Sequence, residues 1–162
     1  MNRDCGRAEL YAAEAAAFDG TDLESELPFD DVAAAIDGVT GGAWWPGGAV
    51  RVVAARRDAR SSNARRIDAT TTVIRLAATQ LTIATAAHEV AHALAGPLLG
   101  HSPVFLAAYL DVVAVITNLD SCDRRGDLHV RQLRGAFDVA ALAVGRRQWP
   151  APPGSIGTAI AL

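Results

Sequence analysis

The segment His88-Glu89-Val90-Ala91-His92 constrains this chain more than any other part of its sequence. It lies in a stretch, residues 82–95, whose apolar side chains recur at helical spacing, and Gly96 supplies the signal for a helix end. Histidines four residues apart lie on one helix face, about 6 Å apart along the axis, so both imidazoles can reach one metal ion. Glu89 points to the side of that face, where its carboxylate can reach a water molecule on the ion. The sequence therefore predicts a zinc-binding helix with Glu89 as the catalytic residue.

A catalytic zinc site needs a third protein ligand and one position open for water. No glutamate follows Glu89 in the chain, which excludes a downstream glutamate ligand. His101 is the first candidate, because a Gly-Pro pair ends the helix and Gly100 permits a sharp turn back toward it. Asp111 and His129 remain as alternative ligands. Asp111 has the further alternatives of orienting a histidine ring from behind or of facing solvent.

The remaining segments predict further helices and two strands. Helices are expected over residues 5–18, 28–36, 104–117 and 128–144. Strands are expected over residues 49–54 and 70–76, which are rich in β-branched side chains. Residues 56–66 have the composition of a hydrophilic loop. Together these elements predict an α+β fold in which a small sheet packs against helices, one of them the motif helix.

Two segments of the chain resemble known families. Residues 88–105 read H-E-V-A-H-A-L-A-G-P-L-L-G-H-S-P-V-F, which resembles the minimal zincin cores of SprT-like proteins. The chain is more similar still to a family of small actinobacterial metallohydrolases that begin with an Arg-Asp and a Tyr-Ala-Ala-Glu segment. These stand here as Arg3-Asp4 and residues 11–14. The resemblance covers the start of the chain and the region of the motif, and elsewhere only the order of elements.

The resemblance implies a zincin-like fold, a single metallohydrolase domain over residues 1–147, and zinc held by His88, His92 and His101. Ser102 replaces a glycine of the SprT-like pattern, and Val104 stands where the metallohydrolase family often has glutamate. Neither difference removes a ligand. Both alter the loop after the motif helix, which bears on substrate preference.

Composition and charge fit one cytoplasmic domain. The chain has 162 residues, 51% of them hydrophobic, and a formal net charge of -3 that offers no general attraction to nucleic acid or anionic lipid. Because the N-terminus lacks the apolar run of a secretory signal and no long apolar stretch occurs, we expect a cytoplasmic location without membrane contact. Cys5 and Cys122 are expected to be free thiols. The proline- and glycine-rich residues 148–162 are expected to form a loosely ordered tail.

The predicted activity is metal-assisted hydrolysis of a peptide or protein, with Glu89 as general base and then as proton donor to the leaving amine. The strand over residues 70–76 is expected to offer its edge to an extended peptide. Tyr109 is either an oxyanion donor or a core residue. Trp44 and Trp45 either line a substrate groove or pack against the sheet.

Two alternatives to a general peptidase stay open at this stage. One is a non-catalytic zincin-like module that binds or regulates a partner. The other is a protease that acts on DNA-bound proteins, for which the arginine-rich segment Arg56–Arg66 would contact phosphate. A simple solvated loop is the plainer interpretation of that segment.

Overall fold

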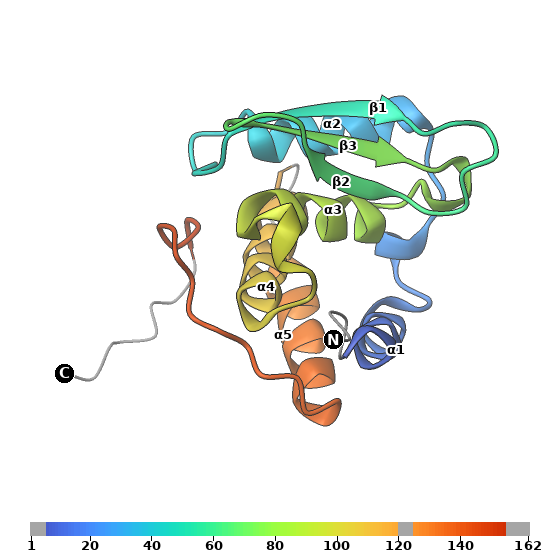
Figure 1. Ribbon diagram of the computed structural model, residues 1–162. Helices are drawn as coiled ribbons and strands as arrows, with labels where there is room; N and C mark the ends of the chain where they lie inside the picture. Colours follow the sequence, from blue (N-terminus) through green and yellow to red (C-terminus); the bar gives the residue numbers. More distant parts are fainter. Residues whose placement is uncertain (1–5, 120–124, 155–162) are drawn as a thin grey trace.

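A computed structural model describes residues 6–119 and 125–154, and these form an α+β fold (Figure 1). The predicted fold class is therefore confirmed at this level. Within the described residues there are five α-helices and one three-stranded sheet: α1 (Arg7–Phe18), α2 (Phe29–Thr40), β1 (Ala49–Ala54), β2 (Asn63–Arg66), β3 (Thr71–Leu76), α3 (Ile83–Ala95), α4 (Pro103–Ile116) and α5 (Arg125–Val139). Short 3-10 helices also occur: η1 (Asp22–Glu24), η2 (Ala78–Gln80) and η3 (Pro97–Leu99). Cys5 and Cys122 lie outside the described residues, as does the Arg3-Asp4 pair.

The sheet has the strand order β1-β3-β2, so β3 is its central strand. β1 runs parallel to β3, with Ala49 opposite Thr71, and β2 runs antiparallel to β3, with Ala64 opposite Ile74. The Asp68 carboxylate closes the turn between β2 and β3 by accepting hydrogen bonds from the backbone N–H groups of Thr70 and Thr71, both at 2.8 Å. The predicted strands 49–54 and 70–76 agree with β1 and β3 to within one residue.

The expected loop over residues 56–66 is wrong at its end, where β2 forms. Its sequence, Asn-Ala-Arg-Arg, contains no β-branched or aromatic residue, so strand propensity gives no signal. Backbone pairing with β3 holds it in place, and charged side chains are typical of an edge strand. Because β3 is paired on both sides, the expectation that residues 70–76 offer a free edge is also wrong. β2 holds the outer edge that lies beside α3.

Helix α3 forms where the motif predicted it, between the sheet and α4 (Figure 1). Its N-cap is Thr82, whose hydroxyl accepts a hydrogen bond of 3.1 Å from the Thr85 N–H, and its last turn ends at Gly96. Eight of its 13 residues are buried, among them His88 and Glu89. Burial of two polar motif residues in the middle of the domain is the first sign that this helix carries a functional site.

Helix α4 begins one residue before its predicted start, with Ser102 as N-cap accepting from the Phe105 N–H at 3.3 Å and Pro103 in the first turn. Phe105 and Tyr109 are buried, and so are residues on the other faces of the helix, because α3, α5 and α2 all contact it. Ten of its 14 residues are buried. Helix α4 is therefore the centre of the hydrophobic core. No helix within the described ranges is both long and apolar enough to cross a membrane.

Helix α5 ends at Val139, five residues earlier than the predicted boundary at Val144. The N–H of Leu142 bonds to the Phe137 carbonyl at 2.9 Å, the N–H of Ala141 bonds to the Asp138 carbonyl at 3.1 Å, and Ala141 has a positive φ of 55°. This is a Schellman ending, which normally has glycine at the left-handed position. Because an alanine gives no stop signal in the sequence, the apolar periodicity predicts a helix that continues to residue 144.

Residues that follow α5 return to the body of the molecule. The guanidinium of Arg147 donates two hydrogen bonds of 2.8 Å to the carboxylate of Asp111, and Trp149 Nε1 donates a third of 2.8 Å. Trp44 Nε1 donates to the Pro150 carbonyl at 2.9 Å. The chain is thus held against α4 through at least Pro150, within the segment expected to be a loose tail.

Candidate metal centre

Three imidazoles converge on one point beside α3. The Nε2 atom of His88 lies 3.2 Å from that of His92 and 3.3 Å from that of His101. One ring nitrogen from each of the three lies within 4.8 Å of the others, the spacing of a group that can hold a metal ion. With zinc–nitrogen bonds of about 2.0–2.1 Å, the ligand nitrogens of a tetrahedral site lie about 3.3–3.4 Å apart. The two close distances fit this geometry, and three ligands leave the fourth position open.

His101 reaches the cluster because the chain reverses direction after α3. Gly96 ends α3, the short η3 follows, and Gly100 adopts φ 55° and ψ -144°, a conformation open essentially to glycine alone. The imidazole of His101 then lies within the cluster directly before the Ser102 cap of α4. The structure therefore brings together all three residues that the sequence analysis named as ligands, and does so by the turn expected at Gly100.

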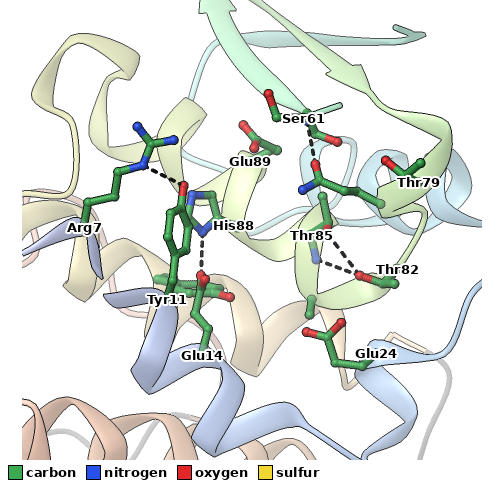
Figure 2. Close-up of a pocket in the computed structure, with 14 residues that line it drawn as sticks. Arg7, Tyr11, Glu14, Glu24, Ser61, Thr79, Thr82, Thr85, His88 and Glu89 are labelled. Atoms are coloured by element: carbon green, nitrogen blue, oxygen red, sulfur yellow. Dashed lines mark hydrogen bonds and ion pairs between the residues drawn. The ribbon is translucent and has the colours of Figure 1, made fainter. Parts of the chain in front are cut away.

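A carboxylate on α1 orients His88. Nδ1 of His88 lies 2.5 Å from Glu14 Oε1, and both side chains are largely buried (Figure 2). The buried Tyr109 contributes a side-chain hydrogen bond to the same carboxylate. When Nδ1–H of a neutral imidazole donates to Glu14, Nε2 must carry the lone pair, and it is Nε2 that faces the other two rings. This carboxylate–histidine arrangement is the usual support for a histidine bound to a metal.

Protonation of the cluster follows from burial and from these neighbours. Burial, together with the adjacent His88 and His101, lowers the pKa of His92 to about 3. Burial also lowers the pKa of His88, but the hydrogen bond and the charge of Glu14 outweigh it and raise the pKa overall. His92 is therefore neutral near pH 7, which is the form that binds a metal.

Glu89 is buried, with 6% of its surface exposed, and its side chain lines the same cavity as His88. Burial raises the pKa of Glu89, as does the charge of Glu14, while His88 and a hydrogen bond from the Ala64 backbone oppose the rise. A carboxylate with a raised pKa is better suited to accept and return a proton than a fully solvated one. The bond to Ala64 also fixes the edge strand β2 next to Glu89.

Aromatic rings enclose the cluster on two sides. Phe105 is fully buried and packs against His92 with ring centroids 4.3 Å apart. Tyr11, on α1, is 43% exposed; its ring stacks on His88 at 6.2 Å and meets His101 edge-on at 5.9 Å. Phe105 therefore closes the buried side of the cluster, and Tyr11 stands at its open side. The Tyr11 hydroxyl accepts a hydrogen bond of 3.3 Å from Arg7 Nε (Figure 2).

A polar cavity of about 320 Å³ adjoins the cluster. It extends from Arg7 and Tyr11, past His88 and Glu89, to Glu24 (Figure 2). Hydroxyl and amide side chains from the segment before β2, from η2 and from the start of α3 complete its wall. The Glu89 carboxylate and the His88 imidazole are therefore exposed to the same cavity.

The alternative ligands lie elsewhere. Asp111 is 6% exposed and its carboxylate is taken up by Arg147 and Trp149, so it neither ligates the cluster nor supports a histidine, and it does not face solvent. His129 is buried against Phe18 and lies 3.4 Å from Asp22. Asp111 thus binds the segment after α5 to α4, and His129 packs α5 against α1, which leaves His101 as the third member of the cluster.

Other candidates from the sequence take structural positions. Tyr109 is 1% exposed and directs its hydroxyl to Glu14, so its role is to support His88 and the core rather than to meet substrate. Trp44 and Trp45 are half-buried against the core, and neither lines the cavity. Their indole N–H groups donate to backbone carbonyls of Pro150 and Gly48. Tyr109 is therefore a core residue, and Trp44 and Trp45 pack against the core instead of lining the cavity.

Sequence reasoning gave no role to the three residues of α1 at the site: Arg7, Tyr11 and Glu14. They lie on α1, more than 70 residues before the motif, and local periodicity cannot show that α1 packs beside α3. The only signal was the Tyr-Ala-Ala-Glu segment, which contributed to the family resemblance without a function attached. Its first and last residues, Tyr11 and Glu14, both contact His88.

Comparison of the chain with protein-family models, with curated proteins and with solved structures finds no match.

Proposed function

We propose that this chain is a zincin-like, zinc-dependent hydrolase that cleaves peptide bonds with Glu89 as its general base. The observation that carries the proposal is the convergence of three imidazole Nε2 atoms beside a cavity that is lined by one of them, His88, and by the buried carboxylate of Glu89. A structural zinc site is closed by four protein ligands, whereas a catalytic one keeps a position free. Among the described residues, the cluster has three.

Zinc is the metal that this donor set favours, because imidazole ligands in a tetrahedral arrangement suit it better than calcium or magnesium. His88, His92 and His101 would hold the ion. When bound, zinc supplies Lewis acidity that lets water ionise near neutral pH and that polarises a carbonyl group. Glu14 and Tyr109 keep His88 in the tautomer that presents Nε2.

Glu89 would accept a proton from the attacking water and transfer it to the leaving amine. Its burial in the cavity wall and its raised pKa suit both steps, because a raised pKa makes the carboxylate a stronger proton acceptor. The hydrogen bond from Ala64 holds the carboxylate in place without occupying all of its acceptor positions.

The extended substrate would lie along the outer side of β2. Arg65 and Ile67 direct their backbone groups toward β3, since Ile67 N–H bonds to Thr71 O at 3.0 Å and pairing alternates along an antiparallel strand. Ala64 therefore directs its backbone groups outward, toward Glu89. A peptide paired with this edge would place its carbonyl groups beside the catalytic carboxylate.

Tyr11 and Arg7 would stabilise the oxyanion that develops on the substrate carbonyl. Tyr11 stands at the open side of the cluster, and the Arg7 guanidinium both donates to its hydroxyl and lies 5.4 Å from its ring centroid. A phenol held by a cation is a better hydrogen-bond donor to a developing negative charge than a free phenol.

Tyr11→Phe is expected to lower kcat about 100-fold while leaving zinc content unchanged, because removal of one oxyanion donor has an effect of this order. Phenylalanine keeps the ring that packs against His88. Steady-state kinetics combined with metal analysis tests this. A variant that keeps wild-type kcat would show that Tyr11 serves only as a packing residue.

Removal of the metal tests the proposed function as a whole. We expect the purified protein to contain one equivalent of zinc, to hydrolyse unstructured protein substrates, to lose this activity with 1,10-phenanthroline, and to regain it with added zinc. Zinc at 100 times its Kd should also stabilise the fold by about 2.7 kcal/mol, roughly 5–10 °C in Tm. A protein that takes up no zinc and melts at the same temperature with or without it would contradict the proposal.

A further inference from the structure

The cavity beside the imidazole cluster is electrically asymmetric. Arg7 lies at one end of it and Glu24 at the other, with His88 and Glu89 between them (Figure 2). The Arg7 guanidinium is engaged with Tyr11. A group that enters the far end of the cavity therefore meets Glu24, at the opposite end from Arg7, the only arginine among the described residues that line the cavity.

Glu24 is a carboxylate without a cationic partner among the residues that the structure describes. Partial burial raises its pKa, and so do the charges of Asp19 and Glu14. A positive charge at this end would relieve the repulsion between carboxylates.

The neutral wall at this end also suits a cation with several N–H donors. The hydroxyl groups of Thr79 and Thr82 line the cavity on the Glu24 side of Glu89 (Figure 2). Ammonium and guanidinium groups are donors only, so hydroxyl oxygens and a carboxylate complete their hydrogen bonding. A large apolar side chain would find little matching surface there.

We propose, on the basis of the proposed function, that the Glu24 end of the cavity binds a positively charged side chain of the substrate, a lysine or arginine next to the bond that is cleaved. This site is part of the same cavity that His88 and Glu89 line, and the carboxylate of Glu24 determines which charge of substrate side chain binds there. Glu24 is thus a specificity residue and not a catalytic one.

Cleavage of three matched peptides that differ only in arginine, leucine or glutamate next to the scissile bond tests this preference. The wild type is expected to favour arginine over leucine in kcat/KM by about tenfold, and Glu24→Gln to remove most of that difference. Glu24→Arg is expected to shift the preference toward glutamate. Glu26→Gln, an exposed residue outside the cavity wall, is the matched control and should keep the wild-type order.

A binding measurement separates this proposal from the proposed hydrolysis. Arginine hydroxamate and leucine hydroxamate are titrated calorimetrically into zinc-supplemented Glu89→Gln protein, with and without Glu24→Gln. Tighter binding of the arginine compound that depends on Glu24 supports the basic pocket even if no peptide is cleaved, in which case only the proposed hydrolase function fails. Equal affinity of the two compounds, or no binding of either, overturns the pocket whatever the outcome of the hydrolysis assay.

Discussion

Glu89→Gln is expected to keep a full equivalent of zinc and the native fold while peptide hydrolysis falls by about 10²–10⁴-fold, the range attributed to a positioned general base. The amide is isosteric with the carboxylate and can still accept the hydrogen bond from Ala64, so the cavity wall keeps its shape. It has no proton-accepting oxygen of comparable basicity. The loss should therefore lie in kcat, with little change in the affinity for a substrate-derived ligand.

Glu9→Gln is the matched control for this variant, because it makes the same change at an exposed position on α1 away from the imidazole cluster. Zinc content by elemental analysis, the circular dichroism spectrum and initial rates are compared for the three proteins. Wild-type rates in Glu89→Gln would exclude Glu89 as the base. A wild-type protein that binds zinc yet cleaves nothing would favour instead the non-catalytic binding module.

The sequence predicted the local structure of the motif region because each signal there acts over a few residues. The N-caps at Thr82 and Ser102 and the glycines at 96 and 100 set the ends of α3 and α4 and the turn between them. The turn that these signals set brings His101, thirteen residues after His88, back to the side of α3 on which His88 lies. A ligand set spread over one helix and the turn after it is thus accessible to reasoning from sequence.

Contacts between distant segments could not be predicted in this way. Glu14 reaches His88 across 74 positions of sequence, and Asp111 reaches Trp149 across 38. Contacts between residues so far apart produce no periodic pattern in the sequence. The sequence therefore leaves Asp111 as a possible ligand and predicts a loosely ordered tail for the segment that contains Trp149. Buried carboxylates are paired, but the sequence does not say with what. The neighbours of His88 therefore had to come from the fold.

The course of β2 shows the same limit in a short segment. This strand of four polar and small residues is held by its backbone hydrogen bonds to β3, because its side chains have little strand propensity. Its position bears on the proposed function, since β2 brings the Ala64 backbone to Glu89 and is an edge strand of the sheet, with which we propose that substrate pairs. The expected pairing of a peptide with a sheet edge thus moves from residues 70–76 to residues 63–66.

His101→Ala is expected to weaken zinc binding by more than the roughly 10–100-fold that loss of an outer partner of a ligand costs, because a direct ligand is removed. His88 and His92 would remain, but two imidazoles do not complete the three-ligand set of a catalytic site. Hydrolysis should fall in parallel with zinc occupancy and recover in part at high zinc concentration. Competition with a chromophoric zinc chelator measures the affinity.

His129→Gln is the control for the loss of a histidine, because His129 is buried outside the cluster and its replacement keeps a side chain that can hydrogen bond to Asp22. It should retain wild-type zinc affinity, even where packing against Phe18 suffers and Tm drops. If His101→Ala holds zinc as tightly as this control, the third ligand is another residue or none. The short distances between the imidazoles would then reflect the turn at Gly100 rather than a metal site.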